Sequence, residues 1–421
     1  MKLFANRRPE FILKAFVATF VLSASCMGQT APLTVTLAQA VEMARQKNPT
    51  LLAAREHMQA VHANEITAGL RQNPELALTG SEVTLGANNP ASPYTYSANV
   101  SRLFERGQKR RWRMDSTRAY SLQADAQYND LERQTLLDVK QNFVQVLQSK
   151  AALEVAKEDL DSWNHTIDLS KHRLDAGDMS GTDFARIDLQ LAQFESDYDN
   201  AVLNLRQNSD QLQLALGIEH PAPDFQIVGD LRAPAMTRTL TEIETLALKN
   251  RPDLLAAQHL VDATAADHHL AVANGTTDPT LAGEYERVAT YNSFGFSVSI
   301  PLRIFDRNQG EKQRTELENS ASRYALAAAH NQVISDIDQA WAAYLSSAHL
   351  AERYNDHYLN EATQIRDNLE FSFQHGGATL LDFLDAQRDF RQTQLNTINA
   401  NAQVWLSIHQ LSFAAATEML P

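Results

Sequence analysis

The chain has 421 residues and a formal net charge of −14 at pH 7, with 15 glycines and 13 prolines. Glycine and proline together stay well below their usual share of about 12%, so long helices are favoured over turn-rich sheets. Because the phosphates of nucleic acids repel carboxylates, so acidic a chain is poorly suited to binding nucleic acid.

Residues 1–25 have the pattern of an export signal peptide. Basic residues between Lys2 and Lys14 precede an apolar run at 15–22 and a small-residue cleavage zone at 23–25. This run is too short to span a bilayer permanently, and no later window approaches about 18 consecutive apolar residues. The mature chain is therefore predicted to leave the cytoplasm, and any insertion into a membrane must use strands.

Cys26 is the only cysteine, which excludes an intrachain disulfide and a thiolate metal cluster. It follows the cleavage zone immediately, as the lipidated cysteine of a bacterial lipoprotein does. Ser23, however, stands where a lipoprotein signal usually has leucine. Two interpretations stay open: a lipid anchor on Cys26, or ordinary cleavage nearby with an incidental thiol.

The two halves of the chain repeat each other. Four short stretches of the first half recur in the same order in the second half, at an offset of about 200 residues. The matched pairs are 48–54 with 251–257, 73–77 with 278–282, 103–108 with 304–309, and 177–184 with 376–383. Duplication of one structural unit is predicted, with a first repeat over 26–217, a linker over 218–239, a second repeat over 240–414 and a tail over 415–421.

Each repeat is expected to contain the same elements in the same order. A helix of about thirty residues begins at Leu37 and again at Leu240, and two strand-like runs follow it. Next comes a stretch without proline, 108–174 or 309–374, which as a helix would be about 100 Å long. Helices of this length do not fit the core of a compact domain. A glycine turn and one more long helix complete the unit.

The strand-like runs alternate apolar residues with small or polar ones. The apolar faces are formed by Tyr96, Ala98 and Val100 in one run, and by Phe294, Phe296, Val298 and Ile300 in its counterpart. A lipid-facing barrel strand requires this alternation, although an edge hairpin of a soluble sheet has it too. Four strands cannot close a barrel, so closure predicts eight strands as a dimer or twelve as a trimer.

The helix after each glycine turn carries apolar residues at steps of three and four, which is typical of coiled-coil packing. In the first repeat they are Phe184, Ile187, Leu191, Phe194, Tyr198, Ala201, Leu205 and Leu212, with Asn208 breaking the seam. In the second repeat they are Phe383, Ala386, Phe390, Thr393, Thr397, Ala400 and Val404. These stripes alone would also fit a periplasmic coiled-coil scaffold without a barrel.

The two-unit plan and the Gly-x-x-x-x-x-Asp-Phe turns at Gly177 and Gly376 resemble the TolC-like outer-membrane factor family, over essentially the whole mature chain. Residues 69–76, 106–110 and 300–310 are similar to its heavy-metal-efflux branch, of the cobalt-zinc-cadmium resistance (CzcC) type. The resemblance implies a mainly α protein with a membrane β-barrel. Three protomers, each with four strands and long antiparallel coiled-coil helices, would form a 12-stranded barrel in the outer membrane of a Gram-negative cell and an α-helical tunnel through the periplasm.

The resemblance further implies a passive export channel rather than an enzyme, with no cofactor of its own. Its partners would be a periplasmic adaptor (membrane fusion) protein and an inner-membrane resistance-nodulation-division pump, which supplies the energy. The branch predicts heavy-metal cations as cargo, and drug efflux and type I protein secretion are the alternatives within the same architecture. No Gly-rich phosphate loop, His-Glu-x-x-His motif or nucleophile elbow indicates enzymatic chemistry.

The glycine turns separate two long helices and therefore lie at the tips of helical hairpins, where positive φ angles let the chain reverse. In the resembled family these tips form the periplasmic mouth and meet the adaptor. The residues predicted to dock it are Gly177, Asp178, Met179, Ser180, Gly376, Gly377, Ala378 and Thr379. Turn chemistry alone would also explain the glycines.

Asp382 and Asp385 lie three residues apart on one face of the last helix, and three copies would form two acidic rings that attract cations. The resemblance places both at the narrow periplasmic gate, with Asp183 as a further candidate. For Asp382, a carboxylate that stabilises the helix start is an equally good explanation. Better-known family members have a gate-locking Arg and Tyr where this chain has Ala378 and Phe373, so a gate that closes here closes differently.

The thirteen histidines do not predict a metal site. His268 and His269 are adjacent, and neighbouring residues on a helix point about 100° apart, which suits two ligands of one ion poorly. His172 and His375 lie near the tips without a partner at helical ligand spacing. A conduit also works better with weak, transient contacts than with tight ones. No resident metal is therefore expected.

Overall fold

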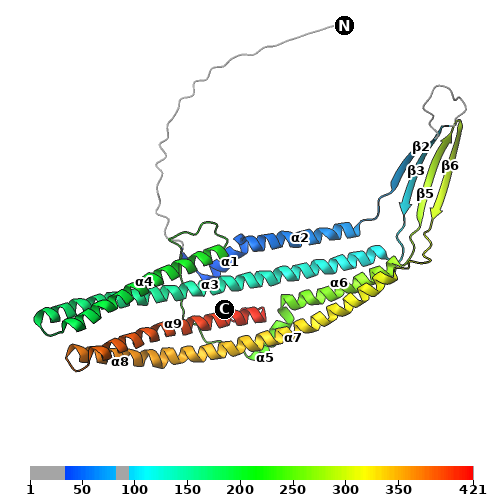
Figure 1. Cartoon of the computed structure of the whole chain (residues 1–421). Helices are drawn as coiled ribbons and strands as arrows, with labels where there is room; N and C mark the ends of the chain where they lie inside the picture. Colours follow the sequence, from blue (N-terminus) through cyan, green and yellow to red (C-terminus); the bar gives the residue numbers. More distant parts are fainter. Residues whose placement is uncertain (1–33, 82–93, 421) are drawn as a thin grey trace, which may run out of the picture.

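The computed structural model describes residues 34–81 and 94–420. The chain is elongated, with helices along its length and a four-stranded sheet projecting at one end (Figure 1). At the opposite end two helical hairpins finish side by side. Among the helices of these ranges, none combines the length and apolar character needed to cross a membrane. The predicted signal peptide and Cys26 lie outside the described residues.

Both repeats follow the order helix, helix, strand, strand, long helix, hairpin turn, helix. The first contains β1 (Thr34–Val35), α1 (Leu37–Lys47), α2 (Pro49–Gly69), β2 (Glu75–Ser81), β3 (Thr95–Leu103), α3 (Lys109–Ala176) and α4 (Gly181–Ala215). The linker contains β4 (Gln226–Ile227), which pairs in parallel with β1. The second contains α5 (Leu240–Asn250), α6 (Pro252–Asn274), β5 (Thr280–Val288), β6 (Tyr291–Ser299), α7 (Gln309–Arg353), the π-helical turn η1 (Tyr354–Tyr358), α8 (Leu359–Gln374) and α9 (Leu380–Ala415).

The prediction of one continuous helix at the start of each repeat is wrong. α1 ends before Asn48 and α5 before Arg251, and a proline then opens α2 or α6. Proline is favourable at the first position of a helix because its missing N–H would have no partner there, while the residue before it is pushed out of the helical conformation. The side chain of Asn48 also caps α2 by accepting hydrogen bonds from the N–H groups of Thr50 (2.9 Å) and Leu51 (3.3 Å).

The second of the two proline-free stretches is interrupted, which the sequence does not predict. α3 runs for 68 residues, whereas η1 divides the corresponding stretch of the second repeat into α7 and α8. At η1 the side-chain amide of Asn355 donates to the carbonyl of Ala351 (2.8 Å) and to Oδ1 of Asn401 in α9 (2.8 Å). A π turn accommodates one extra residue in a helix. Neither proline nor glycine occurs in η1, so no sequence signal marks it.

The large sheet has the strand order β2-β3-β5-β6 and is antiparallel throughout. Residues directly opposite one another in such a sheet point to the same face. Ala98 lies opposite both Leu78 and Tyr285, and Tyr285 lies opposite Phe294. The register thus collects apolar residues on one face: Leu76, Leu78, Tyr96, Ala98, Val100, Leu281, Tyr285, Phe294, Phe296 and Val298. The predicted alternation is confirmed.

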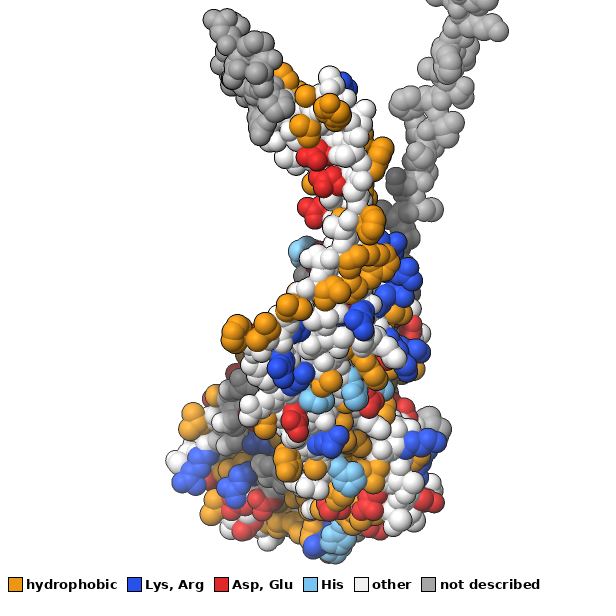
Figure 2. Space-filling model, turned by 90° about the vertical axis from the view of Figure 1, so that its right-hand side faces the viewer, with side chains coloured by type: hydrophobic (Ala, Val, Ile, Leu, Met, Phe, Trp, Pro, Cys, Tyr) orange, Lys and Arg blue, Asp and Glu red, His pale blue; other side chains and the backbone are white. Residues whose placement is uncertain are grey.

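The helices within residues 34–81 and 94–420 do not cover this apolar face. Phe294 is 85% exposed and Phe296 is 91% exposed. Figure 2 shows apolar side chains along the projecting sheet and continuing toward the helices below it. A sheet that belonged to a soluble domain would bury such a face, whereas a lipid-facing sheet must expose it.

Each repeat has an apolar core where its short first helix meets the long helices. Ala44 of α1 packs with Phe143 of α3 and Leu212 of α4. In the second repeat Ala247 of α5 packs in the same way with Ile337 of α7 and with α9. The predicted stripe on α9 is buried at Phe383, Ala386, Phe390, Thr397, Ala400 and Val404. Coiled-coil packing of the long helices is thereby confirmed.

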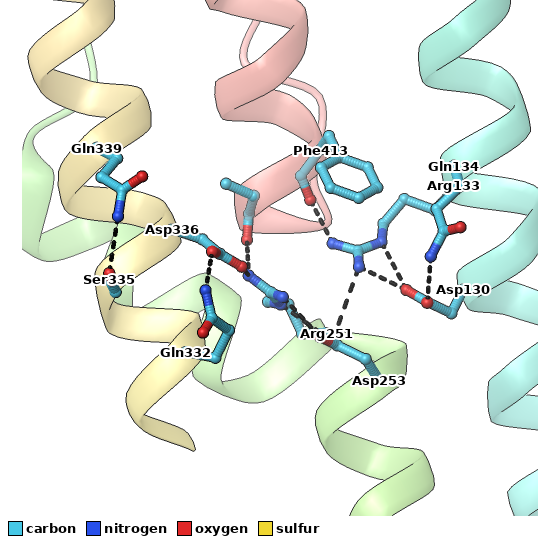
Figure 3. A network of polar contacts seen from close by, with 11 residues as sticks. Asp130, Arg133, Gln134, Arg251, Asp253, Gln332, Ser335, Asp336, Gln339 and Phe413 are labelled. Atoms are coloured by element: carbon cyan, nitrogen blue, oxygen red, sulfur yellow. Dashed lines mark hydrogen bonds and ion pairs between the residues drawn. The ribbon is translucent and has the colours of Figure 1, made fainter. Parts of the chain in front are cut away.

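A charged network joins the two repeats in the middle of the molecule (Figure 3). Arg251, which is 3% exposed, donates to both carboxylate oxygens of Asp253 (3.0 and 2.6 Å) and to Asp336 of α7 (2.8 Å). Arg133 of α3 donates to the carbonyl of Phe413 (2.5 Å), and its guanidinium lies 3.9 Å from the centre of that ring. Burial raises the pKa of Asp253, but the hydrogen bonds and charge of Arg251 outweigh burial and hold that pKa below its usual value.

Candidate functional site

The two hairpin tips have the same backbone geometry. α3 ends at Gly177 (φ 81°) and α8 is followed by Gly376 (φ 75°), both in the left-handed region that disfavours a side chain. The N–H groups of Asp178 and Gly377 each donate to a carbonyl five residues earlier, at 2.8 and 2.7 Å. This hydrogen bond belongs to the Schellman motif, which ends a helix and reverses the chain.

The helix after each turn begins with a side-chain cap. In α4 the hydroxyl of Ser180 accepts a hydrogen bond from the N–H of Asp183 (3.1 Å) and donates to its Oδ2 (2.8 Å). In α9 the hydroxyl of Thr379 accepts from the N–H of Asp382 (3.2 Å), while the Thr379 hydroxyl (2.6 Å) and N–H (3.1 Å) both donate to Oδ2 of Asp382. Both carboxylates therefore stabilise the start of a helix, as the alternative interpretation of Asp382 has it.

The cap keeps a negative charge at the tip. Hydrogen bonds from the side chain and then the backbone of Thr379 lower the pKa of Asp382 below its usual value. In the described ranges its second oxygen, Oδ1, has no hydrogen-bond partner, and the residue is exposed. In the part of the chain that the structure describes, Asp385 makes one ion pair, with Arg388 (3.3 Å). The side chain of Asp385 is 52% exposed and that of Arg388 is 66% exposed. Such a pair contributes little to stability and leaves the carboxylate accessible.

The docking candidates form a surface of backbone and short side chains. Gly177, Asp178, Ser180, Gly376, Gly377 and Thr379 are exposed. Ala378 is half-buried, as is Met179, whose side chain packs on an apolar cluster beneath the turns. The exposed surface of the two turns therefore consists mainly of backbone groups and short polar side chains, unlike the apolar centre of a typical protein interface.

An aromatic cluster under the tips holds the two hairpins together. The ring of Trp163 in α3 lies 4.8 Å from that of Phe194 in α4 and 6.2 Å from that of Phe383 in α9. Phe383 in turn stacks on Phe373 of α8 at 5.0 Å. Phe373, where the resemblance implies a tyrosine, makes an apolar contact here. Stacked pairs of this kind contribute about 0.5–1.5 kcal/mol beyond their buried area.

Two contacts near the hairpin tips were not predicted from the sequence. Trp163 lies on α3, for which no apolar stripe is predicted, and its indole N–H donates to the carbonyl of Ile187 across the hairpin (3.1 Å). Further from the tips, Arg391 of α9 forms an ion pair with Asp197 of α4 (2.6 Å). These partners are 194 residues apart in the chain, so no local pattern indicates the pair.

Histidine does not build a metal centre in the described part of the chain. His268 lies 3.2 Å (Nδ1 to Oγ1) from Thr315, while the ring of His269 stacks on Trp112 at 4.4 Å. Among the residues 34–81 and 94–420, no group of three or more His, Cys, Asp and Glu side chains is placed to hold a metal ion.

The chain matches the family described as outer membrane efflux protein over residues 40–218 and 245–417, with one match in each repeat. It belongs to this family. The outer membrane efflux protein is accordingly a passive conduit and not an enzyme, and it resides in the outer membrane, as predicted. The family match and the exposed face that carries Phe294 and Phe296 agree with a membrane sheet and do not favour a periplasmic scaffold without a barrel.

Two curated relatives and a solved structure span nearly the whole efflux protein. Outer membrane protein TolC of Vibrio cholerae serotype O1 is 24% identical over 424 residues, which cover 96% of each chain. Cobalt-zinc-cadmium resistance protein CzcC of Cupriavidus metallidurans is 25% identical over 380 residues, 88% of this chain and 87% of CzcC. The structure of CusC superposes with a TM-score of 0.77 at 19% identity, over 97% of this chain and 98% of CusC. The predicted fold class is thereby confirmed.

Proposed function

We propose that this efflux protein is the outer-membrane conduit of a three-component system that exports heavy-metal cations. One observation supports cations as cargo: carboxylates lie at both ends of the molecule, near the hairpin tips and in the sheet. Asp382 and Asp385 are exposed near the hairpin tips, and Glu284 and Glu286 lie on the polar face of the sheet. Rings of carboxylates attract cations and repel anions.

The sheet register supports a polar lumen. Glu284 lies opposite Asn99 and Gly295, so it points away from the apolar face. Along the middle of the sheet, the residues that share its face are Ala77, Thr79, Ser97, Asn99, Ser101, Ala282, Glu286, Ser293, Gly295 and Ser297. The larger apolar residues on this face, Leu103, Val288 and Tyr291, lie toward the ends of the strands. If the apolar face contacts lipid, these residues surround the interior of the barrel.

Three copies of the chain would close that barrel. β2 and β6 are the outer strands of the four-stranded sheet, and open strand edges in lipid cost several kcal/mol per unpaired group. A dimer would have eight strands, and the interior of an eight-stranded barrel is filled by side chains. A homotrimer with twelve strands leaves room for passage and is therefore the assembly we propose.

The remaining partners follow from the position of the tips. A periplasmic adaptor would dock on the two turns, at Gly177, Asp178, Met179, Ser180, Gly376, Gly377, Ala378 and Thr379. An inner-membrane resistance-nodulation-division pump would supply the energy, since the conduit itself is passive. Asp382 and Asp385, with Asp183 as a further member, would form the acidic entrance.

Cargo is tested by the sensitivity of a strain that lacks this protein to zinc, cobalt, cadmium, copper and a panel of organic drugs, beside its complemented control. We expect selective sensitivity to the metals, in keeping with the similarity to the cobalt-zinc-cadmium resistance protein. Sensitivity to organic compounds alone would keep the conduit and move its cargo to drugs. Loss of a secreted polypeptide, with unchanged sensitivity to metals and drugs, would indicate protein secretion.

A further inference from the structure

A polar cavity separates the two hairpins beyond the aromatic cluster. Its volume is about 520 Å³, and its lining comes from α3, α4 and α9. The charged residues of that lining are Asp159 of α3, Asp197 of α4 and Arg391 of α9. The cavity therefore lies where α9 of the second repeat faces α3 and α4 of the first. We call this region the joint between the two hairpins.

Arg391 links the two hairpins at this joint. Nη1 of Arg391 donates to Oδ2 of Asp197 (2.6 Å), which ties α9 to α4. The guanidinium also lies over the ring of Phe194, 5.1 Å from its centre, so the ion pair and the aromatic cluster are continuous. Asp159 faces the same cavity, and in the described part of the chain its Oδ2 is buried without a hydrogen-bond partner. The carboxylates of Asp159 and Asp197 therefore both lie around the cavity with the guanidinium of Arg391.

The charges that face Asp159 come from four helices. Glu158 is its neighbour on α3, Asp197 belongs to α4, Arg366 to α8 and Arg391 to α9. Burial is the largest influence and raises the pKa of Asp159 to about 6, against the opposing attraction of Arg391. A carboxyl group of this kind changes its charge in the pH range that a periplasm experiences.

We propose that Asp159 makes the joint between the two hairpins responsive to protons. When Asp159 is ionised, a buried carboxylate without a hydrogen-bond donor weakens the packed arrangement. When it is protonated, this cost disappears. If the hairpins separate, water reaches the carboxyl group and its pKa returns toward its usual value. The packed arrangement is therefore most favoured in acid and loses this advantage as the pH rises from 3.8 to about 6, above which Asp159 is ionised in both states.

The size of the effect follows from linkage. Each pKa unit between the packed and separated states changes their ratio tenfold. The pKa of Asp159 rises from 3.8 to about 6. The full shift would change the ratio about a hundredfold per protomer, and because water partly screens the group we expect about tenfold. This inference concerns the helical joint and does not depend on the cargo.

The test measures the distance between the hairpins as a function of pH. Spin labels are attached at A185C in α4 and D389C in α9, both exposed positions, in the full-length protein with Cys26→Ser. Labelled chains are diluted into unlabelled ones, and distances are recorded from about pH 4.5 to about pH 8. We expect a single short distance at the acid end, a longer population that grows as the pH rises toward about 6, and no further change above it.

Two variants identify the group responsible. Asp159→Asn should retain the short distance at every pH, because its side chain carries no charge. Asp161→Asn removes an exposed carboxylate from the opposite side of α3 and should behave as the parent protein does. A distance that does not change with pH in the parent protein, or an equal pH response in Asp159→Asn, would overturn the proposal.

Discussion

Replacing Arg251 with alanine is expected to destabilise the protein by about 3 kcal/mol or more, because it leaves two carboxylates without their buried partner. Arg251 donates to Asp253 and to Asp336, and it is 3% exposed. The free energy of unfolding is measured in detergent by guanidinium titration, followed by circular dichroism. The transition midpoint should fall clearly below that of the parent protein.

Two further variants show whether the lost stability comes from the orphaned carboxylates. Arg314→Ala removes an arginine that also bonds two carboxylates, Glu311 and Glu318, but on an exposed surface, and it should leave the midpoint unchanged. Arg251→Met combined with Asn at positions 253 and 336 should recover much of the loss. Equal midpoints for Arg251→Ala and Arg314→Ala would show that the network of Figure 3 does not stabilise the fold.

Phe296→Arg is expected to prevent stable assembly in the outer membrane. Phe296 lies near the middle of β6 on the apolar face and is 91% exposed. An arginine on the lipid face near the bilayer midplane costs about 2–4 kcal/mol, and a trimer would incur this cost three times. The readout is the amount of heat-sensitive oligomer that is recovered from the outer-membrane fraction.

Ser297→Arg is the matched control, since the next residue along β6 points to the opposite face. It should assemble normally and lower the cation preference of the lumen, because it places a positive charge diagonally next to Glu284, which lies opposite Gly295 on the same face. Normal assembly of Phe296→Arg together with failure of Ser297→Arg would reverse the assignment of the two faces.

Much of the fold can be predicted because its determinants are periodic. Alternation fixes the faces of β3 and β6, and steps of three and four fix the buried side of α9. The turn at Gly376 is visible because only glycine suits its φ of 75° without strain. The pattern Thr379-x-x-Asp382 also predicts the start of a helix, since a hydroxyl followed three residues later by a carboxylate can form a cap.

What could not be predicted depends on contacts between distant segments. The residues before Pro49 and Pro252 are Asn48 and Arg251, and their side chains form hydrogen bonds with the last turns of α4 and α9. Asn48 donates to the carbonyl of Ala215 (2.8 Å) and Arg251 to that of Ala414 (3.5 Å), and neither contact is visible in a local pattern. For the same reason the pairing of Arg391 with Asp197 could not be foreseen. The cavity beside that pair follows only from how three helices pack.

Ala378 and Phe373 have no ionic or hydroxyl group with which to make the gate contacts that the resemblance implies. Phe373 stacks on Phe383 inside the hairpin tip. The ionic contact between the hairpins is instead made by Arg391 and Asp197, away from the turns. Neither Asp382 nor Asp385 takes part in that ion pair, which is compatible with the acidic entrance that we propose.

The central claim, an acidic conduit for cations, is tested most directly by the reversal potential of the purified protein in a planar bilayer with a salt gradient. We expect the parent protein to prefer cations and the double variant Asp382→Asn, Asp385→Asn to lose most of that preference. Asp188→Asn, on an exposed face of α4, is the control and should not change it. Anion preference in the parent protein, or identical reversal potentials in the parent and the double variant, would contradict the account.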